Sequence, residues 1–240
     1  MSDRFHDGGQ VVELCIRTAD QAMPHRVGAV EAVADVGLAG DRHASRASPR
    51  QVLIASSRTY ERLDLPPMAL RQNVLVDCDL GLLSSGTRLR FSSGVEMVVM
   101  FACEPCGRLE GQQTGLLARI GTERGALARV TAGGMLRAGD VMRCAGVTGL
   151  LWSNDWRERV RQVLRFVPNG HWVTYSRLAE LAGVSSGYCR AFPRLISSFG
   201  QEAQSLTDAV KAASWRGRPW DGEGLHTAVL ALTNNAEREE

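Results

Sequence analysis

The sequence has 240 residues, of which 44% are apolar and 22% are charged, and its formal net charge is +2. This composition excludes a disordered chain, and the length suits one large domain or two small ones, of which we expect two. There is no run of about 20 apolar residues and no apolar core near the polar N-terminus, so we expect no membrane partner and a cytoplasmic protein with reduced cysteines. Lys211 is the only lysine, which excludes lysine Schiff-base chemistry anywhere before it.

From residue 11 to residue 144 the chain consists of short strand-like runs separated by glycines. The alternation of polar and apolar residues from Thr87 to Phe91 has the period of two that is typical of half-buried strands. The predicted strands are "VVELCIR", "RQVLIAS", "QNVLVDC", "TRLRF", "VEMVVMF", "ALARVTAGG" and "DVMRC". Only "SSRTYERLD" and "TGLLARIG" are predicted as short helices, and Gly133-Gly134 and Gly139-Asp140 indicate hairpins. Many short strands at close spacing predict a β-barrel or a closed sheet.

The pattern changes at residues 145–155, after which helical periods appear. In "WRERVRQVLRFV" the apolar residues share one face, with arginines opposite. That face holds Val160, Val163, Leu164 and Val167. A short strand around "HWVTY" leads to a second helix, with Thr174 as its N-cap and Gly183 as its stop. A third helix follows a tight turn, and this order is typical of a winged-helix or helix-turn-helix fold.

The segment "FACEPCGR" carries Cys103 and Cys106 in a CxxC pattern that has three interpretations. Half of a zinc site requires two further ligands, and the sequence has neither a second CxxC nor an HxxxH pair. A redox dithiol normally opens a helix in a βαβ unit, whereas this pair follows a strand. The third interpretation makes Cys106 a single functional thiolate, with Arg108 lowering its pKa, while Cys103 is an inert buried thiol.

Six short segments help to choose between the three interpretations of the CxxC pattern. They are "GLAGDRH", "RQN", "GTRLRF", "CEPC", "QQTGLLARI" and "RGALARVTAGGMLRAGD". In order and spacing they resemble MOSC domains, named after the C-terminal domain of molybdenum cofactor sulfurases, over about residues 10–145. The resemblance implies a β-barrel fold in which Cys106 is the characteristic cysteine. It also implies that this cysteine either binds molybdenum or receives sulfur.

The resemblance also implies a set of residues around the molybdenum cofactor, a molybdopterin. These are Asp41, Arg42, His43, Arg71, Asn73, Arg108 and Thr114. Arginine and amide side chains suit its phosphate and its hydrogen-bonding ring, which supports Arg71 and Asn73 independently. For Asp41 and His43 a plain turn, in which the aspartate bonds its own backbone, remains the alternative.

Residues 159–196 resemble the DNA-binding domain of alkylguanine-DNA alkyltransferases and alkyltransferase-like proteins. This resemblance implies DNA contacts by Tyr175, Arg177 and Arg190, with Arg190 entering the base stack when a base is flipped out. The Pro-Cys-His-Arg acceptor of that family is absent, so alkyl transfer is excluded. Pro193 follows closely after Arg190 and predicts either a kink or the start of a new helix. A winged helix kept for protein contacts is the alternative.

Residues 151–220 carry ten basic and five acidic side chains, whereas residues 1–150 nearly balance. This surplus is compatible with a nucleic-acid partner.

The sequence therefore predicts an α+β protein with a MOSC domain at residues 1–148 and a winged-helix-like domain at residues 149–240, which ends in a polar tail. The expected function is reduction of N-hydroxylated bases, or of related N-oxygenated small molecules, at a molybdenum bound by Cys106. Such an oxidoreductase needs an electron-donor protein as partner, because no flavin or iron-sulfur motif is present. The alternative is a non-enzymatic sulfur carrier, or a DNA-damage-recognition or regulatory protein.

Overall fold

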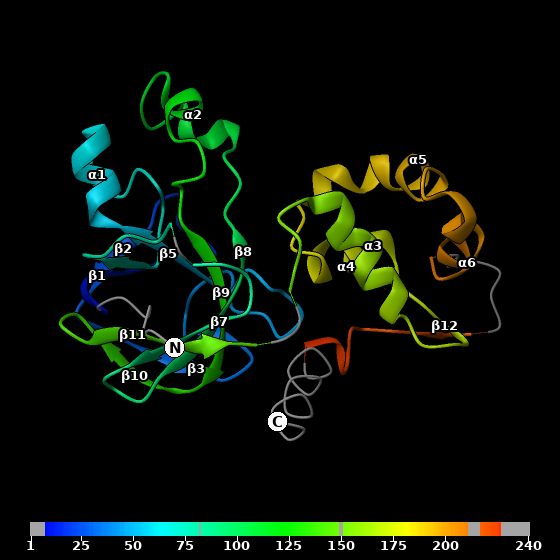
Figure 1. Ribbon diagram of the computed structural model, residues 1–240, viewed down its shortest axis with the longest axis horizontal. Coiled ribbons are helices and arrows are strands. Elements are labelled where there is room, and N and C mark those ends of the chain that lie inside the picture. The colour runs from blue at the N-terminus through cyan, green and yellow to red at the C-terminus, as the bar shows by residue number, and fades with distance from the viewer. Residues whose placement is uncertain (1–7, 82, 149–150, 211–216, 227–240) are drawn as a thin grey trace, which may run out of the picture. The chain divides into compact units, whose positions relative to one another are not determined.

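The computed structural model describes residues 8–81, 83–148, 151–210 and 217–226. These residues fall into two compact units. The first contains residues 8–46 and 50–148, and the second contains residues 47–49 and 151–226 (Figure 1). Lys211 and the polar tail lie outside the described residues.

The first unit is a closed barrel of seven strands, which run in the order β11-β7-β8-β9-β5-β6-β1, with β11 pairing back onto β1. The strands are β1 (Gly9–Ile16), β5 (Val52–Ser56), β6 (Val74–Val76), β7 (Thr87–Phe91), β8 (Glu96–Ala102), β9 (Ala126–Ala132) and β11 (Val141–Val147). Neighbours are antiparallel except for the parallel pair of β5 and β6. Each strand corresponds to one of the seven predicted runs, so the predicted barrel is confirmed.

Alternating burial explains why these segments close around one core. In β7, Thr87, Leu89 and Phe91 point inward, while Arg88 and Arg90 face outward and pair with Glu96. The inward apolar residues from all seven strands form one buried cluster. A sheet that closes on itself leaves few unpaired edges, which favours this arrangement for many short strands.

Four further strands were missed by the sequence analysis. They are β2 (His25–Val27), β3 (Ala29–Val33), β4 (Gly37–Leu38) and β10 (Gly134–Arg137). β2 extends the barrel sheet next to β1, and the other three form a small sheet in the order β10-β3-β4.

Neither Gly133-Gly134 nor Gly139-Asp140 forms the predicted hairpin: Gly133 connects β9 to β10, whose first residue is Gly134, while Gly139 belongs to the turn between β10 and β11. β10 pairs with β3 rather than with β9 or β11, so Gly133 and Gly134 carry the chain from the barrel into the small sheet. A Cβ at Gly133 would lie 2.8 Å from the carbonyl oxygen of Ala32, which explains why a glycine is needed at this crossing.

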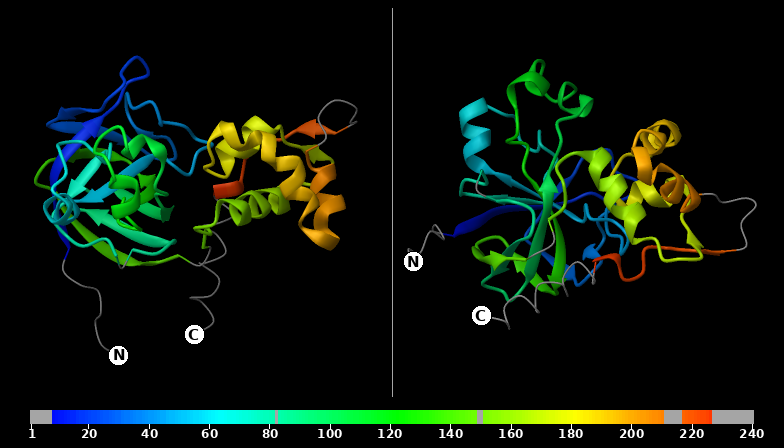
Figure 2. Two further views of the ribbon diagram at one scale, coloured as in Figure 1. Left: turned by 90° about the horizontal axis from the view of Figure 1, so that it is seen from above. Right: turned by 45° about the vertical axis from the view of Figure 1, so that its right-hand side comes forward.

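Both predicted helices of the first unit are confirmed as α1 (Ser57–Leu63) and α2 (Leu116–Arg119). They lie beside each other near one end of the barrel (Figures 1 and 2). Leu63 from α1 and Leu116 from α2 belong to a second apolar cluster, together with Leu70 and Leu109. Leu109 ends the short 3₁₀ helix η1 (Gly107–Leu109), so this cluster anchors the loop that begins at Cys106.

The second unit is mainly helical. Its elements are α3 (Trp156–Phe166), β12 (His171–Trp172), α4 (Tyr175–Leu181), η2 (Ser186–Ala191), α5 (Phe192–Ser197), η3 (Gly200–Glu202), α6 (Ala203–Asp208) and β13 (Arg218–Pro219). Thr174 is the N-cap of α4, as predicted, because its side chain accepts a hydrogen bond from the Arg177 N–H. Pro193 opens α5 instead of kinking a longer helix. β12 and β13 form only a two-residue parallel pair, so the winged-helix character stays a prediction.

One expectation about α3 is wrong. Arg159 does not join the exposed arginines but is completely buried. Its Nε donates to the Ala182 carbonyl at 3.0 Å, and its Nη1 donates to the carbonyls of Ser153 and Asn154 at 3.0 and 2.9 Å. The buried guanidinium group thus provides hydrogen bonds to backbone carbonyls inside the unit. The period of a helix does not reveal that an arginine has this role.

Candidate functional site

Cys106 lies in the loop after β8, at the first residue of the turn that enters η1. Its Sγ is 3.0 Å from Nη1 of Arg124, which donates a hydrogen bond to it, and the same Nη1 also donates to the carbonyl oxygen of Glu104. Arg124 is only 6% exposed, so its guanidinium is fixed beside the sulfur. A hydrogen bond from a cation strongly favours the thiolate over the thiol.

The electrostatic surroundings of Cys106 also favour the thiolate. Partial burial alone raises the pKa of the Cys106 thiol, but the charge and hydrogen bond of Arg124 and the backbone N–H and charge of Arg108 outweigh it and bring the pKa below its usual value. In contrast, burial raises the pKa of the Cys103 thiol. Of the CxxC pair, Cys106 therefore has the surroundings of a reactive sulfur.

The remaining barrel cysteines have raised pKa values. Burial and the neighbouring Glu13 raise the pKa of Cys15 to about 12, and burial also raises the pKa values of Cys78 and Cys144. Among the described residues, no group of three or more His, Cys, Asp or Glu side chains is arranged to hold a metal ion. A metal at Cys106 would need most of its ligands from a cofactor.

Five arginines interact electrostatically with one another, three of them also with Cys106, and we call them the arginine cluster. They are Arg17, Arg42, Arg71, Arg108 and Arg124. Burial and the repulsion of neighbouring guanidinium groups lower the pKa of Arg71, and the same effects lower the pKa of Arg17 to about 10. Guanidinium groups that repel one another to this extent create a strongly positive site, which suits an anionic ligand.

Two buried donors in the arginine cluster have no partner among the described residues. They are Nε of Arg71 and Nε of Arg124. Arg71 also has a φ of +60°, a left-handed conformation that arginine rarely adopts, and its Nη2 donates to the Ala22 carbonyl. A buried N–H without an acceptor is costly, so these two donors fit a ligand with anionic or carbonyl oxygens.

Asp41 and His43 form a hydrogen-bonded pair beside Arg17. Oδ1 of Asp41 accepts from the His43 backbone N–H at 2.8 Å and lies 3.0 Å from His43 Nδ1, while His43 Nε2 lies 3.1 Å from Nη2 of Arg17. Since a guanidinium can only donate, His43 Nε2 must accept, and the ring proton therefore sits on Nδ1, from which it is donated to Asp41. Asp41 thus fixes both the tautomer and the orientation of His43.

The side chain of Asn73 forms three hydrogen bonds within the barrel. Its Oδ1 accepts from the Leu53 N–H at 3.0 Å, and its Nδ2 donates to the Cys15 carbonyl at 3.2 Å and to Asp41 Oδ2 at 2.9 Å. The same Asp41 oxygen accepts from the Arg17 N–H at 2.9 Å. Asp41 and Asn73 therefore link the chain segments of β1, β5 and β6 through buried hydrogen bonds.

The other three residues predicted to contact the cofactor are exposed at the surface of the barrel unit. Arg42 and Arg108 are exposed members of the arginine cluster. Thr114 is exposed, and none of the described contacts joins it to the cluster. Next to it, Gly115 (φ +75°) opens α2, where the Glu110 carboxylate accepts from the N–H groups of Gly115 and Leu117.

Arg17 and Arg124 were missed by the sequence analysis. Arg17 follows β1 and Arg124 precedes β9, far from Cys106 in the sequence. The one signal available was that Arg17 is the last residue of a predicted strand and Arg124 lies two residues before another, because a barrel brings the ends of its strands together.

The three residues predicted to contact DNA are placed differently from one another. The Tyr175 ring packs edge-on against Phe192, with 5.9 Å between ring centroids. Arg177 donates to the Asp221 carbonyl at 2.8 Å and to Glu180 at 2.7 Å. Arg190 is exposed in η2 and has no hydrogen-bond or ion-pair partner among the described residues. Only Arg190 is therefore free to meet a ligand without a rearrangement.

The fold and the site define a barrel protein in which a cysteine with a lowered pKa lies beside a cluster of arginines. Comparison with protein families matches residues 39–143 to the MOSC domain, so this part of the chain is a MOSC domain. No curated protein matches the sequence significantly. In the described part of the chain, no helix has the length and apolar character to cross a membrane.

Several solved structures resemble the chain, among them the following two. The YUAD protein from Bacillus subtilis is 19% identical with a TM-score of 0.51, over 57% of this chain and 95% of that one. YiiM from Geobacillus stearothermophilus is 12% identical with a TM-score of 0.48, over 78% of this chain and 98% of that one. The first likeness supports the barrel fold.

The contact between Arg124 and Cys106 gives a testable pH dependence. In the Arg124→Met variant, burial remains while the main opposing charge is lost, so we expect the pKa of Cys106 to rise above its usual value. Because one pKa unit changes the thiolate fraction tenfold, alkylation of Cys106 at pH 7 should slow by about tenfold or more. Peptide mass spectrometry after iodoacetamide treatment at several pH values measures this rate.

Arg129→Met is the matched control for this experiment. Arg129 is also a buried arginine of the barrel, but it bonds the Arg46 carbonyl and Asp35 rather than a thiol. Equal slowing in both variants would show that loss of barrel stability, and not loss of the Arg124 charge, controls the reactivity of Cys106.

Proposed function

We propose that the first unit binds the molybdenum cofactor and, with it, reduces N-hydroxylated bases or related N-oxygenated compounds. The observation that carries this proposal is the Cys106 sulfur beside Arg124, within a cluster that retains two buried, unpartnered guanidinium N–H groups. A MOSC domain is associated with the molybdenum cofactor in general, which agrees with this reading.

The residues present fit this cofactor. Cys106 offers one soft thiolate ligand, which suits a metal whose other ligands come from a dithiolene. Arg71 and Arg124 offer their unpartnered Nε–H groups to the phosphate or ring oxygens, and Arg42 and Arg108 add exposed positive charge. When bound, the molybdenum of the cofactor supplies two-electron oxidation and reduction.

The chain itself has to handle protons and position the substrate. Reduction of an N–OH group to N–H takes up two electrons and two protons and releases water, so proton donors are needed near the substrate. His43 is half-exposed and oriented by Asp41, so it is the candidate for proton transfer once its Nε2 leaves Arg17 and takes up a proton. An electron-donor protein has to supply the electrons, because the sequence has no flavin or iron-sulfur motif.

Metal and pterin analysis of the Cys106→Ser variant tests this function. The wild-type protein, purified from a host that makes molybdenum cofactor, should hold molybdenum in stoichiometric amount. The variant should lose nearly all of it, because serine lacks the thiolate ligand. Cys144→Ser, another partly exposed thiol of the barrel, is the control and should retain the metal.

The result also separates the two classes of function. Absence of molybdenum from the wild-type protein would remove the reductase proposal. In that case, detection of a persulfide on Cys106 would support the sulfur-carrier alternative.

A second candidate function is DNA binding by the second unit, either alongside the reductase or as a damage-recognition or regulatory role. Two observations favour it, namely the exposed and unpartnered Arg190 and the basic surplus of residues 151–220. Tyr175 and Arg177 would contribute only after they leave their internal partners. A gel shift with duplex DNA over a range of salt concentrations tests this candidate, because no shift at low salt would remove it.

A further inference from the structure

An exposed aromatic and basic surface lies at the start of α3 and along η2 and α5. We call it the stacking surface, and it consists of Trp156, Arg157, Tyr188, Arg190 and Arg194. The rings of Trp156 and Tyr188 lie 4.9 Å apart between centroids at an angle of 54°. The Arg157 guanidinium lies 4.8 Å from the centroid of the Trp156 ring. Neither ring belongs to the DNA contacts that the sequence resemblance implies.

The rings of this surface are accessible. Tyr188 is 48% exposed, one of the largest exposures of a large apolar side chain among the described residues. Trp156 is half-buried, so one part of its ring packs while the rest faces outward. Since Arg157 lies over the Trp156 ring, the exposed part of the Tyr188 ring and the part of Trp156 that Arg157 leaves uncovered are the ring surfaces on which nucleic-acid bases can stack.

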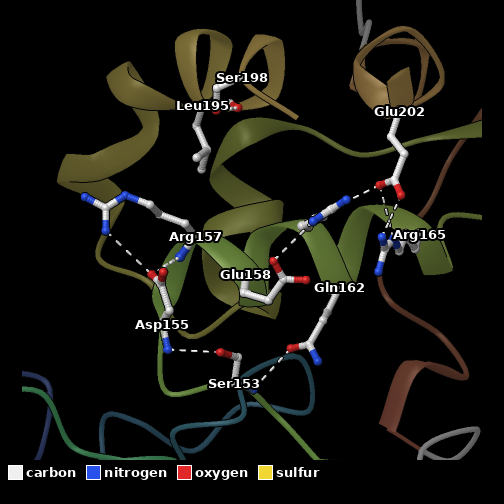
Figure 3. Close-up of polar contacts among 10 residues, drawn as sticks. Ser153, Asp155, Arg157, Glu158, Gln162, Arg165, Leu195, Ser198 and Glu202 are labelled. Atoms are coloured by element: carbon white, nitrogen blue, oxygen red, sulfur yellow. Dashed lines mark hydrogen bonds and ion pairs between the residues drawn. The ribbon is translucent and has the colours of Figure 1, made fainter. Parts of the chain in front are cut away.

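The charges distinguish this surface from the other end of α3. There, Glu202 pairs with Arg165 at 2.6 Å (Figure 3). Arg161 pairs with the same carboxylate at 3.0 Å and with Glu158 at 3.6 Å, so two carboxylates offset these two arginines within the unit. Figure 3 also shows Arg157 at the opposite end of the helix, next to its neighbour Asp155.

On the stacking surface itself, Asp155 is the acidic group that contacts Arg157, at 3.6 Å. Arg190 and Arg194 have no acidic partner among the described residues. The surface therefore keeps the positive charges of these two exposed arginines, which follow Tyr188 along η2 and α5.

We propose that the stacking surface binds single-stranded nucleic acid, with bases stacked on Tyr188 and Trp156 and phosphates bound by Arg190 and Arg194. This rests on the proposed nucleic-acid role of the second unit and names its ligand and its binding face. Aromatic rings next to unpaired arginines match the alternation of flat bases and phosphates along a strand. A duplex shows its bases only as edges in the grooves, so it offers no base face to these rings.

Fluorescence anisotropy of a labelled oligothymidylate with the full-length protein tests this proposal. Tyr188→Ala should weaken binding about tenfold or more, because it removes a stacking platform without opening the core. Arg190→Ala/Arg194→Ala should weaken binding and reduce the slope of log K against log salt by about 1.4, since each phosphate contact on a single strand contributes about 0.7. Arg165→Ala, an exposed arginine of α3 that is paired with Glu202, is the control and should bind like the wild type.

Three outcomes would overturn the proposal, and they are distinguishable. Binding of the oligonucleotide that is unchanged in both test variants would mean that another surface holds it. Binding of a matched duplex without binding of the single strand would leave the DNA-binding candidate standing but remove the stacking surface. Binding of neither nucleic acid at low salt would remove both.

Discussion

Replacement of Arg159 by methionine should lower the free energy of unfolding of the second unit by about 3 kcal/mol. The Arg159 side chain is completely buried and donates to the carbonyls of Ala182, Ser153 and Asn154. Methionine can fill much of the volume of the aliphatic stem, but it leaves three carbonyl oxygens without these donors. The loss would be a large share of the stability of a domain of this size, since whole domains have about 5–15 kcal/mol.

Urea unfolding followed by tryptophan fluorescence measures this effect in the full chain. All five tryptophans lie between residues 152 and 220, so the signal reports the second unit and not the barrel. Arg165→Met is the control on the same helix, and it should cost less than about 1 kcal/mol because its exposed pair with Glu202 is weak. Similar losses of unfolding free energy in both variants would contradict a stabilising role for the buried hydrogen bonds of Arg159.

Most of the barrel was predictable from local pattern because its strands, apart from the three-residue β6, have enough residues to show alternation or a continuous apolar run. The segment Thr87 to Phe91 shows this directly, with alternate residues buried and exposed. The small sheet was not predictable in the same way, because β4 has two residues and β10 begins within a glycine pair. Glycines mark a turn, but they do not say which strand the chain joins after it, and at Gly134 that strand is β3.

The candidate site was only partly accessible to sequence reasoning. Cys106 and Arg71 were found from short motifs, whereas Arg124 meets Cys106, and Arg17 meets the arginine cluster, only because the barrel brings distant strand ends together. Nearly every basic residue of this chain is an arginine, so the residue type itself carried no signal. Asp41 and Asn73 were predicted to contact the cofactor, and that assignment stays a prediction. The structure shows the hydrogen bonds that each of them makes within the barrel.

Replacement of Asn73 by aspartate should destabilise the barrel by about 3 kcal/mol at pH 7, and it should do so in a pH-dependent way. The new carboxylate would lie where Nδ2 now donates to Asp41 Oδ2 at 2.9 Å, in a buried position. Two carboxylates this close cannot both be ionised, so the pair has to share a proton and its upper pKa is raised. The destabilisation should therefore be largest at pH 7 and should shrink as the pH falls towards about 5, as the shared proton forms an O–H···O bond.

In the wild-type barrel, the contribution of Asp41 to the free energy of unfolding should not change between pH 7 and pH 5. Although burial alone raises the pKa of Asp41, its hydrogen bonds with His43 and Arg17 bring it below the usual value. A carboxyl with a lowered folded pKa stabilises the fold above its unfolded pKa of about 3.9, and the stabilisation is lost only as the pH falls through the folded value. Asp41 therefore contributes equally at pH 7 and pH 5 in the wild type.

Hydrogen exchange of peptides from β5 in increasing urea, at pH 7 and pH 5, compares Asn73→Asp with Asn73→Ala. The alanine variant loses the same donors to Asp41 and Cys15 without adding a charge, so its destabilisation should be the same at both pH values. The difference between the two variants therefore isolates the charge on Asp41. If the stabilities of the two variants respond identically to pH, Asp41 is not ionised in the folded barrel. His43 would then be oriented by a neutral carboxyl group and not by a carboxylate.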